Sequence, residues 1–309
     1  MVEKYGKIVK GLGGLYETRV RGEDGSVERL ISRAKGILRR DEEKLLVGDN
    51  VTVSIDESIE GGIVISGVAE RKNSLIRPPL ANLDYIFIVF AAKKPSPVIE
   101  TVDKLTAIAE HNSILPIIVI TKTDLDKTAA DEYAAIYRSV GYPTFVTSSE
   151  SGEGTDEIKA YISEVMRDGA TAAFAGASGV GKSTLLNALF PDLSLATSEI
   201  SRKIERGRHT TRHVELFLLE GGGFLADTPG FSLIDFERFD FFSLEDLPLA
   251  FPEIRDLVGQ CRYVVCAHVG EGADECAIAK AVANGKIPET RVASYRSVWR
   301  TLKAKKGYN

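Results

Sequence analysis

The stretch GASGVGKST, residues 176–184, decides the fold of this 309-residue chain. It fits the pattern G-x-x-x-x-G-K-[ST], with Gly176, Gly181, Lys182 and Ser183 at the fixed positions. The apolar run TAAFA precedes the stretch, and STLLNALF, which has the apolar spacing of a helix, begins at its serine. A strand, a glycine-rich turn and a helix in this order predict a phosphate-binding loop in an α/β domain. An ordinary glycine-rich turn is the alternative.

The residues of this loop have distinct predicted roles. Glycines let backbone N–H groups surround the phosphates of a nucleoside triphosphate. Lys182 would reach the β- and γ-phosphates, which also makes it a candidate catalytic residue, and the Ser183 hydroxyl would bind Mg²⁺. The predicted phosphate contacts are Gly176, Ala177, Ser178, Gly179, Val180, Gly181, Lys182, Ser183 and Thr184.

A second stretch, ITKTDLD at residues 120–126, would select the base. Asp124 can accept hydrogen bonds from N1–H and from the 2-amino group of guanine, whereas adenine would leave this carboxylate unpaired. Lys122 would lie along the base, and the backbone of TSS, residues 147–149, would donate to the guanine oxygen. Threonine at position 121 stands where asparagine is more usual. These residues predict GTP as the nucleotide.

A third stretch, ADTPG at residues 226–230, also ends an apolar run. Asp227 would hold the Mg²⁺ shell, and the Gly230 N–H would sense the γ-phosphate. Between this stretch and the phosphate loop, RGRHTTRHVEL supplies Thr210 and Thr211, one of which would bind Mg²⁺ and order a switch loop. Together the three stretches contain the parts of one GTPase site.

The residue that orients the attacking water is the least conventional part of the predicted site. Many GTPases place a glutamine just after the D-x-x-G element, but this chain has Phe231, which cannot orient water. Intrinsic hydrolysis should therefore be slow and depend on a partner or another group. His209, beside the switch threonines, is the catalytic candidate, and a purely structural histidine is the alternative.

The order of these elements differs from that of an ordinary GTPase, in which the phosphate loop comes first. Here the base-reading stretch comes first, then the serine loop (TSS, residues 147–149), the phosphate loop, the switch threonines and ADTPG. Each element occurs once, so two separate nucleotide-binding domains are not indicated. Joining the usual ends of the domain and reopening it after D-x-x-G gives this order and leaves the parallel sheet intact. The sequence therefore predicts a circular permutation.

The C-terminal part contains all three cysteines of the chain and predicts a metal site. Cys261, Cys266 and Cys276 fall in one window together with His268. Three thiolates and an imidazole at short spacings suit a closed tetrahedral Zn²⁺ site that stabilises a segment with little core of its own. Free buried cysteines are the alternative.

These motifs together resemble those of the ribosome small-subunit-dependent GTPase A (RsgA) family. The resemblance covers essentially the whole chain, including NSLIRPP, GRHTTRHVEL, DTPGF and CRYVVCAH. Seven residues, VGEGADE, separate His268 from Cys276, which is longer than the family spacing and leaves Cys276 the ligand most in need of a test. By resemblance Thr211 is the switch residue, and His209 is the candidate group for hydrolysis. The resemblance assigns guanine contact to the 121–124 segment and the serine loop: Thr121, Lys122, Thr123, Asp124 and Ser148.

The resemblance also implies an architecture of three domains. Short apolar runs that alternate with Gly, Asp and Asn predict a small antiparallel barrel at the N-terminus, and the resemblance implies that residues 1–70 form an OB-like β-barrel that binds RNA. A circularly permuted GTPase domain with a parallel sheet and flanking helices should span 71–233. A helical zinc-binding domain should span 234–309.

The expected partners are GTP or GDP, with Mg²⁺, and the small ribosomal subunit with its rRNA. The net charge of −5 argues against nucleic acid on average, but two basic clusters offer an RNA surface unless they are solvated faces. We expect a cytoplasmic protein, because residues 1–14 lack the apolar core of a signal peptide. We also expect a monomer without a membrane partner. The clusters are Arg29, Arg33, Lys35, Arg39 and Arg40, and Arg291, Arg296, Arg300, Lys303, Lys305 and Lys306.

The predicted activity is GTP hydrolysis late in assembly of the small subunit, stimulated by that subunit. One alternative is an RNA-binding assembly chaperone in which bound nucleotide only regulates binding. Another is a GTPase whose target is a protein. Hydrolysis rates with and without small subunits distinguish these functions.

Overall fold

The structure is a computed structural model, which describes residues 2–22, 26–35, 44–56, 58, 62–76, 78–191, 214–227 and 243–306. Contacts between Cα atoms divide it into two compact units. The first unit contains Met1–Tyr85, Tyr161–Phe174 and Phe190–Phe231, and the second contains Ile86–Ala160, Ala175–Leu189 and Ser232–Asn309. The predicted domain boundaries after residues 70 and 233 stay predictions.

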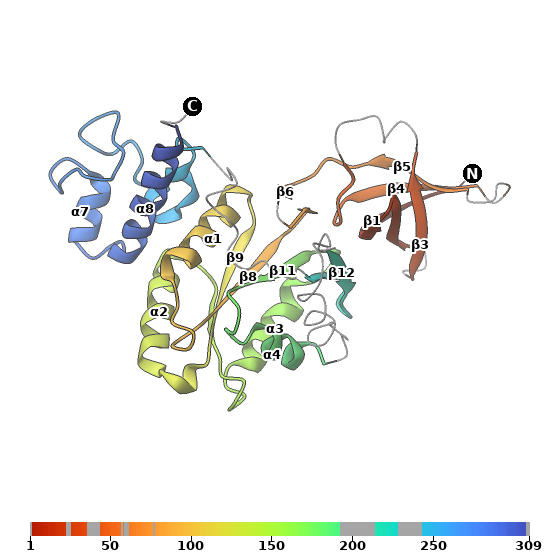
Figure 1. The fold of residues 1–309 in the computed structure, drawn as a ribbon, viewed down its shortest axis with the longest axis horizontal. Helices are drawn as coiled ribbons and strands as arrows, with labels where there is room; N and C mark the ends of the chain where they lie inside the picture. Colours follow the sequence, from red (N-terminus) through yellow and green to blue (C-terminus); the bar gives the residue numbers. More distant parts are fainter. Residues whose placement is uncertain are drawn as a thin grey trace. The chain divides into compact units, whose positions relative to one another are not determined.

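The N-terminal part of the first unit is a closed five-stranded barrel (Figure 1). Its strands are β1 (Val2–Leu12), β2 (Leu15–Arg21), β3 (Val27–Ala34), β4 (Asn50–Ile55) and β5 (Ile63–Val68). They are ordered β1-β2-β3-β5-β4, and antiparallel pairing of β1 with β4 closes the barrel. Alternating apolar side chains fill its interior, among them Ile8, Val20, Val53 and Ile65. The predicted OB-like barrel is confirmed.

Two further sets of strands belong mainly to the first unit. A short ribbon joins β6 (Ser74–Leu75) to β7 (Leu80–Ala81), and a second set contains β11 (Thr171–Ala175), β12 (Glu215–Leu218) and β13 (Phe224–Asp227). β11 and β13 are parallel, as predicted, but β12 and β13 are antiparallel. The two are joined by a tight turn in which the Gly222 N–H donates to the Leu219 carbonyl at 2.9 Å. A link this short cannot hold the crossover helix that a parallel pair requires.

The second unit contains the buried centre of the nucleotide-binding fold. Its strands are β8 (Tyr85–Ala91), β9 (Leu115–Thr121) and β10 (Thr144–Val146), and its helices here are α1 (Ile99–His111), α2 (Lys127–Val140) and α4 (Lys182–Leu189). The division between the units falls within α3 (Thr155–Val165). β9 lies between β8 and β10 and is parallel to β10. β8 and β9 are buried along nearly their whole lengths, as expected of strands covered on both faces. Strands with helices between them agree with the α/β architecture expected of this part of the chain.

Local sequence signals fix where α2 begins and ends. The Asp126 carboxylate accepts a hydrogen bond from the Ala129 N–H at 3.1 Å, which satisfies a free donor at the start of the helix. Gly141 ends the helix in the left-handed region with φ of 98°, a conformation that glycine adopts without strain. The helix start therefore lies directly after the base-reading stretch.

The C-terminal module, defined here as residues 243–306, is helical and also belongs to the second unit. It contains η3 (Leu247–Ala250), α6 (Pro252–Arg255), α7 (Ala277–Ala283) and α8 (Glu289–Lys306). α8 packs against α1, and Phe251, Ile254, Tyr295 and Val298 are buried in the module. Within the described residues, no helix combines the length and the apolar character needed to cross a membrane.

Arg291 on α8 is fully buried, which contradicts its predicted place in a basic rRNA surface. Its Nη1 donates to Asp103 of α1 at 2.6 Å, and its Nε donates to Glu253 of α6 at 2.6 Å. Its guanidinium also lies over the Phe251 ring, 4.9 Å from the centroid. Arginine is so often exposed that a sequence pattern cannot reveal such a pair. This residue binds the C-terminal module to α1 instead.

Candidate GTP site and metal centre

The base-reading stretch and the phosphate loop meet in the second unit. The Thr121 hydroxyl, at the end of β9, donates to the Val180 carbonyl, which lies 59 residues further along the chain. The Lys122 ammonium, on the next residue, donates to the Gly179 carbonyl at 2.7 Å. Two separate half-sites would not make these contacts. The structure thus brings the two predicted elements together in one site.

Close packing and left-handed glycines shape the phosphate loop. β11 ends at Ala175, and a Cβ on Gly176 would meet the Val89 carbonyl oxygen at 2.2 Å, so only glycine fits there. Gly179 and Gly181 have φ values of 78° and 93°. α4 begins at Lys182, and Ser183 and Thr184 in its first turn are exposed. The loop therefore has the backbone geometry and the open helix start that phosphate binding requires.

The base-reading stretch is held by buried hydroxyl groups. Asp124 is exposed, and its carboxylate accepts a hydrogen bond from the fully buried Ser148 hydroxyl, which fixes its orientation. Lys122 has a left-handed φ of 56°. Thr121, in the usual place of asparagine, lies within hydrogen-bond distance of both the Val180 carbonyl and the Phe90 carbonyl. A hydroxyl at this position thus reaches the phosphate loop.

The sequence did not predict one residue of this site. The Lys94 carbonyl accepts a second hydrogen bond from the Lys122 ammonium, at 2.7 Å. Because this contact uses backbone, it leaves no signature in the side-chain pattern. Lys94 lies in the segment after β8, so three separate segments meet at Lys122.

Several predicted residues cannot be placed. His209, Thr211 and Gly230 lie outside the described residues, as do Thr210 and Phe231. Asp227 is the last residue of β13, and its side chain also lies outside the described part. The roles predicted for these residues stay predictions.

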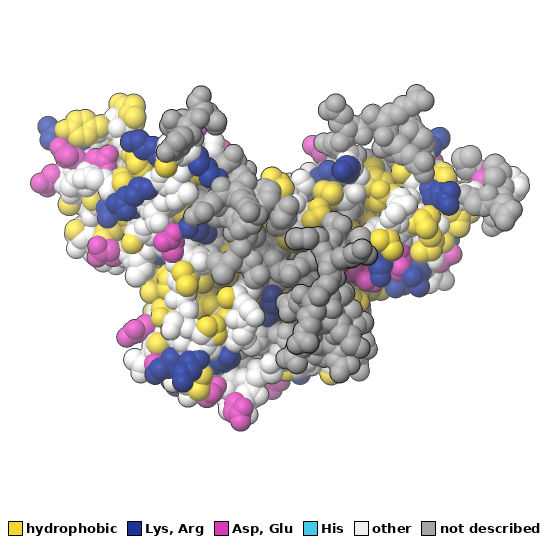
Figure 2. Space-filling model, viewed as in Figure 1, with side chains coloured by type: hydrophobic (Ala, Val, Ile, Leu, Met, Phe, Trp, Pro, Cys, Tyr) yellow, Lys and Arg dark blue, Asp and Glu magenta, His cyan; other side chains and the backbone are white. Residues whose placement is uncertain are grey.

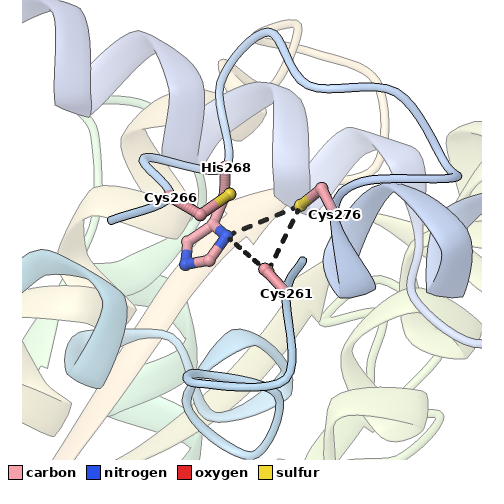
Figure 3. A group of neighbouring side chains, drawn as sticks. All are labelled: Cys261, Cys266, His268 and Cys276. Atoms are coloured by element: carbon pink, nitrogen blue, oxygen red, sulfur yellow. Dashed lines mark hydrogen bonds between the residues drawn. The ribbon is translucent and has the colours of Figure 1, made fainter. Parts of the chain in front are cut away.

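The four predicted metal ligands form one group in the C-terminal module (Figure 3). The ligand atoms of Cys261, Cys266, His268 and Cys276 all lie within 4.8 Å of one another. His268 Nδ1 is 3.5 Å from the sulfur of Cys261 and 3.5 Å from that of Cys276. The longer loop before Cys276 does not displace it from the group.

The donor atoms of this group suit a metal ion, although burial alone favours the neutral thiols. Burial raises the pKa of the Cys266 thiol to about 12, and burial also raises the pKa of Cys276. Thiolates are the form that binds metal, and a bound cation lowers the pKa of its thiols. Three sulfur atoms and one imidazole nitrogen are a donor set that suits a closed tetrahedral site. The group can therefore hold a metal ion.

Two residues that the sequence did not predict hold the turn that carries His268. The Glu271 carboxylate accepts hydrogen bonds from the N–H groups of Ala267, Val269 and Gly270, at 3.3, 2.9 and 3.1 Å. Tyr295 of α8 donates its hydroxyl to the Ala267 carbonyl at 3.0 Å. Burial disfavours the charge on Glu271, but these backbone donors outweigh it and lower its pKa. Glu271 lies in the seven-residue segment between His268 and Cys276, so this segment supplies a support for the turn that carries the ligand.

Comparison with known proteins places this chain among GTPases of one family. Residues 68–237 match the model of the RsgA GTPase, and residues 5–63 match that of the RsgA N-terminal domain. A protein of Geobacillus sp. (strain WCH70) named "Small ribosomal subunit biogenesis GTPase RsgA" is 40% identical over 305 residues, which are 97% of this chain and 98% of that protein. The Bacillus subtilis (strain 168) protein of the same name is 39% identical over 306 residues, with the same coverage.

Solved structures agree with the sequence comparisons. The circularly permuted GTPase YloQ matches with a TM-score of 0.79 and 36% identity, covering 98% of this chain and 96% of YloQ. YjeQ from Thermotoga maritima matches with a TM-score of 0.80 and 33% identity, covering 97% of this chain and 99% of YjeQ. The circular permutation inferred from the order of the motifs is therefore confirmed. This chain belongs to the RsgA GTPase family.

Proposed function

We propose that this GTPase hydrolyses GTP during biogenesis of the small ribosomal subunit, the process named for its relatives. The observation that supports a single working site most directly is the contact of Thr121 and Lys122 with the carbonyls of Val180 and Gly179. These bonds hold the base-reading stretch against the phosphate loop. A nucleotide bound there would contact both at once.

The proposed guanine contacts centre on Asp124. Ser148 donates to one carboxylate oxygen and thereby orients the group, while the carboxylate stays exposed and can accept from guanine. Adenine offers no pair of donors at these positions, so its binding would leave the carboxylate without partners. The Lys122 side chain, Thr123 and the backbone near Ser148 would complete the base site.

The proposed phosphate contacts come from residues 176–184. Lys182 would bind the β- and γ-phosphates, and backbone N–H groups of the glycine-rich loop would bind the remaining oxygens. We propose that Ser183 and Thr211 bind Mg²⁺, with Asp227 in its outer shell and Gly230 at the γ-phosphate. The ion would neutralise charge that develops on the transferred phosphoryl group. His209 is proposed to position the attacking water, because phenylalanine occupies the usual glutamine position at residue 231.

The metal held by Cys261, Cys266, His268 and Cys276 is proposed to be a structural zinc ion. The donor set and the convergence of its atoms within 4.8 Å support this assignment. All four tetrahedral positions are filled by side chains, so no position is open for substrate. Such a site stabilises the fold around it and takes no part in GTP hydrolysis.

The barrel is proposed to contact rRNA through the outer face of β3. Arg29, Ile31 and Arg33 alternate with the buried residues Leu30 and Ser32, so all three side chains project outward. Basic groups next to an exposed apolar side chain suit a phosphate backbone with unstacked bases. Lys35 is exposed as well, whereas Arg39 and Arg40 lie outside the described residues. We expect the protein to work as a monomer in the cytoplasm.

GTP hydrolysis measured with and without purified small subunits tests this function. We expect stimulation of at least about a hundredfold, since partner-completed GTPase sites gain this much or more. Salt should weaken the stimulation, because contacts with rRNA phosphates release counterions. Equal single-turnover and steady-state rates with and without subunits, at low salt and saturating GTP, would contradict the proposal. Binding to subunits without stimulated turnover would instead favour an RNA-binding assembly chaperone.

A further inference from the structure

The loop between the first two metal ligands carries an exposed apolar tip. Val264 and Val265, here called the valine tip, are 102% and 93% exposed. The next most exposed of the large hydrophobic side chains in the described residues, Tyr5, is 73% exposed. Two adjacent valines make no contribution to a core in this position, so the fold itself gives no reason for them.

The loop that carries the valine tip is tied to the rest of the module on either side of it. The loop runs from Cys261 to Cys266, so a metal bound by the cluster would fix both of its ends. The Arg262 N–H donates to the Glu275 carbonyl at 2.8 Å, and the Tyr263 hydroxyl donates to the Glu275 carboxylate at 3.1 Å. These contacts restrict the loop that presents the apolar group, and such restriction lowers the entropy cost of binding a partner.

The charge around the valine tip indicates the class of the partner. Residues 256–276 contain four carboxylates, Asp256, Glu271, Asp274 and Glu275, and one basic side chain, Arg262. In Figure 2, hydrophobic side chains lie among acidic ones, with Lys or Arg side chains beside them, in the region where Figure 1 draws α7. This charge repels RNA phosphates and complements a basic protein surface.

We propose that the valine tip inserts into an apolar pocket, rimmed by lysine or arginine, on a protein of the small ribosomal subunit. This inference rests on the proposed function and adds a protein contact to the rRNA contacts of the barrel. The valines supply apolar area that is desolvated on docking, and the acidic residues around them select the basic rim. The metal cluster then has a role in recognition, because it holds the loop that presents the tip.

Binding to purified small subunits, with a non-hydrolysable GTP analogue bound, tests the valine tip. The double substitution Val264→Asp and Val265→Asp should weaken binding at least about tenfold, because it puts charge into an apolar pocket. The matched control is Val258→Asp, which alters a 44% exposed valine of the same module and should leave binding unchanged. GTP affinity and metal content of each variant show that the site and the module are intact. If the double aspartate variant no longer binds the metal, the variant with Val264→Ser and Val265→Ser is used in its place. The same loss of subunit binding is expected for it.

Two further measurements identify the class of the partner. A photo-crosslinking amino acid at position 264 should react with a ribosomal protein, whereas crosslinks to rRNA or to a second copy of this chain would overturn the proposal. Asp274→Lys should weaken binding if the pocket has a basic rim, and tighter binding would instead indicate RNA. If the double aspartate variant binds subunits as tightly as the wild type does, the docking proposal for the valine tip is overturned, while the proposed function is not. Failure of the wild-type chain to bind subunits would overturn the proposed function with it.

Discussion

Replacing Arg291 by methionine is the sharpest test of how the C-terminal module is attached. The Arg291 and Asp103 side chains are both 0% exposed, and Glu253 is 7% exposed. Methionine keeps most of the apolar stem but removes the donors, so Asp103 loses its buried positive partner. Removing one partner of such a pair costs about 3–5 kcal/mol, because the remaining charge stays buried without compensation.

Urea unfolding followed by the fluorescence of Trp299, the single tryptophan of the chain, measures this loss. Trp299 lies on α8, so it reports directly on the C-terminal module. With a slope of about 2 kcal/mol per molar urea, the midpoint should fall by about 1.5–2.5 M. Arg300→Met, which removes an exposed arginine from the same helix, should change the free energy of unfolding by less than about 0.5 kcal/mol.

The stability of the Arg291→Met variant should depend on pH in a direction that an experiment can check. Burial raises the pKa of Asp103 above its ordinary value even with Arg291 beside it. Without the arginine this pKa should rise further, so the folded variant binds a proton more tightly than the unfolded chain does. Its stability should therefore increase as the pH falls from 8 towards 5, and its deficit relative to the wild type should shrink. A loss below about 1 kcal/mol at pH 7.5, or a deficit that grows on acidification, would refute the role given to Arg291.

Three further outcomes are expected. Asp124→Asn should lower GTP affinity and improve binding of xanthosine triphosphate, because the amide can donate to the oxygen at purine C2; unchanged affinities in equilibrium titration would remove Asp124 from the base site. Lys182→Ala and Ser183→Ala should abolish GTP turnover while leaving urea unfolding unchanged, and normal turnover in either would contradict the phosphate-loop assignment. Glu271→Gln should weaken zinc binding about 10–100-fold in chelator competition and alter the spectrum of the Co²⁺-substituted site, whereas Asp274→Asn should not. Zinc affinities equal to the wild type would show that Glu271 does not support the metal turn.

The nucleotide site and the metal ligands could be predicted because their chemistry is local in sequence. Gly176 and Gly181 are required by the backbone of the loop, and Asp124 by the donors of guanine, so spacing alone identifies them. The circular permutation followed from the order of these motifs. The antiparallel pairing of β12 and β13 also had a signal, since the three glycines at 221–223 leave no room for a crossover.

Other features depend on contacts that sequence spacing does not encode. Arg291 belongs to a run of basic residues, yet its place opposite Asp103, 188 positions earlier, is decided by the packing of α8 on α1. In the sequence, Glu271 is one of several acidic residues in a polar loop, and only the structure shows that it accepts hydrogen bonds from three backbone N–H groups. Tyr295 likewise gains its role only from the carbonyl that it meets. A charged or polar side chain has many possible partners, and only the folded chain selects one.

The two contacts made by α8 limit how the C-terminal module can move. Arg291 binds α1, and Tyr295, one turn further along the same helix, binds the turn that carries His268. In the permuted order, ADTPG, the predicted γ-phosphate sensor, comes shortly before this module in the sequence. A free swing of the module on loss of the γ-phosphate is therefore one movement to consider. Such a swing would have to separate the buried Arg291 from Asp103 and break its direct contact with α1. Any movement that keeps these two contacts must carry α1, α8 and the turn of His268 together.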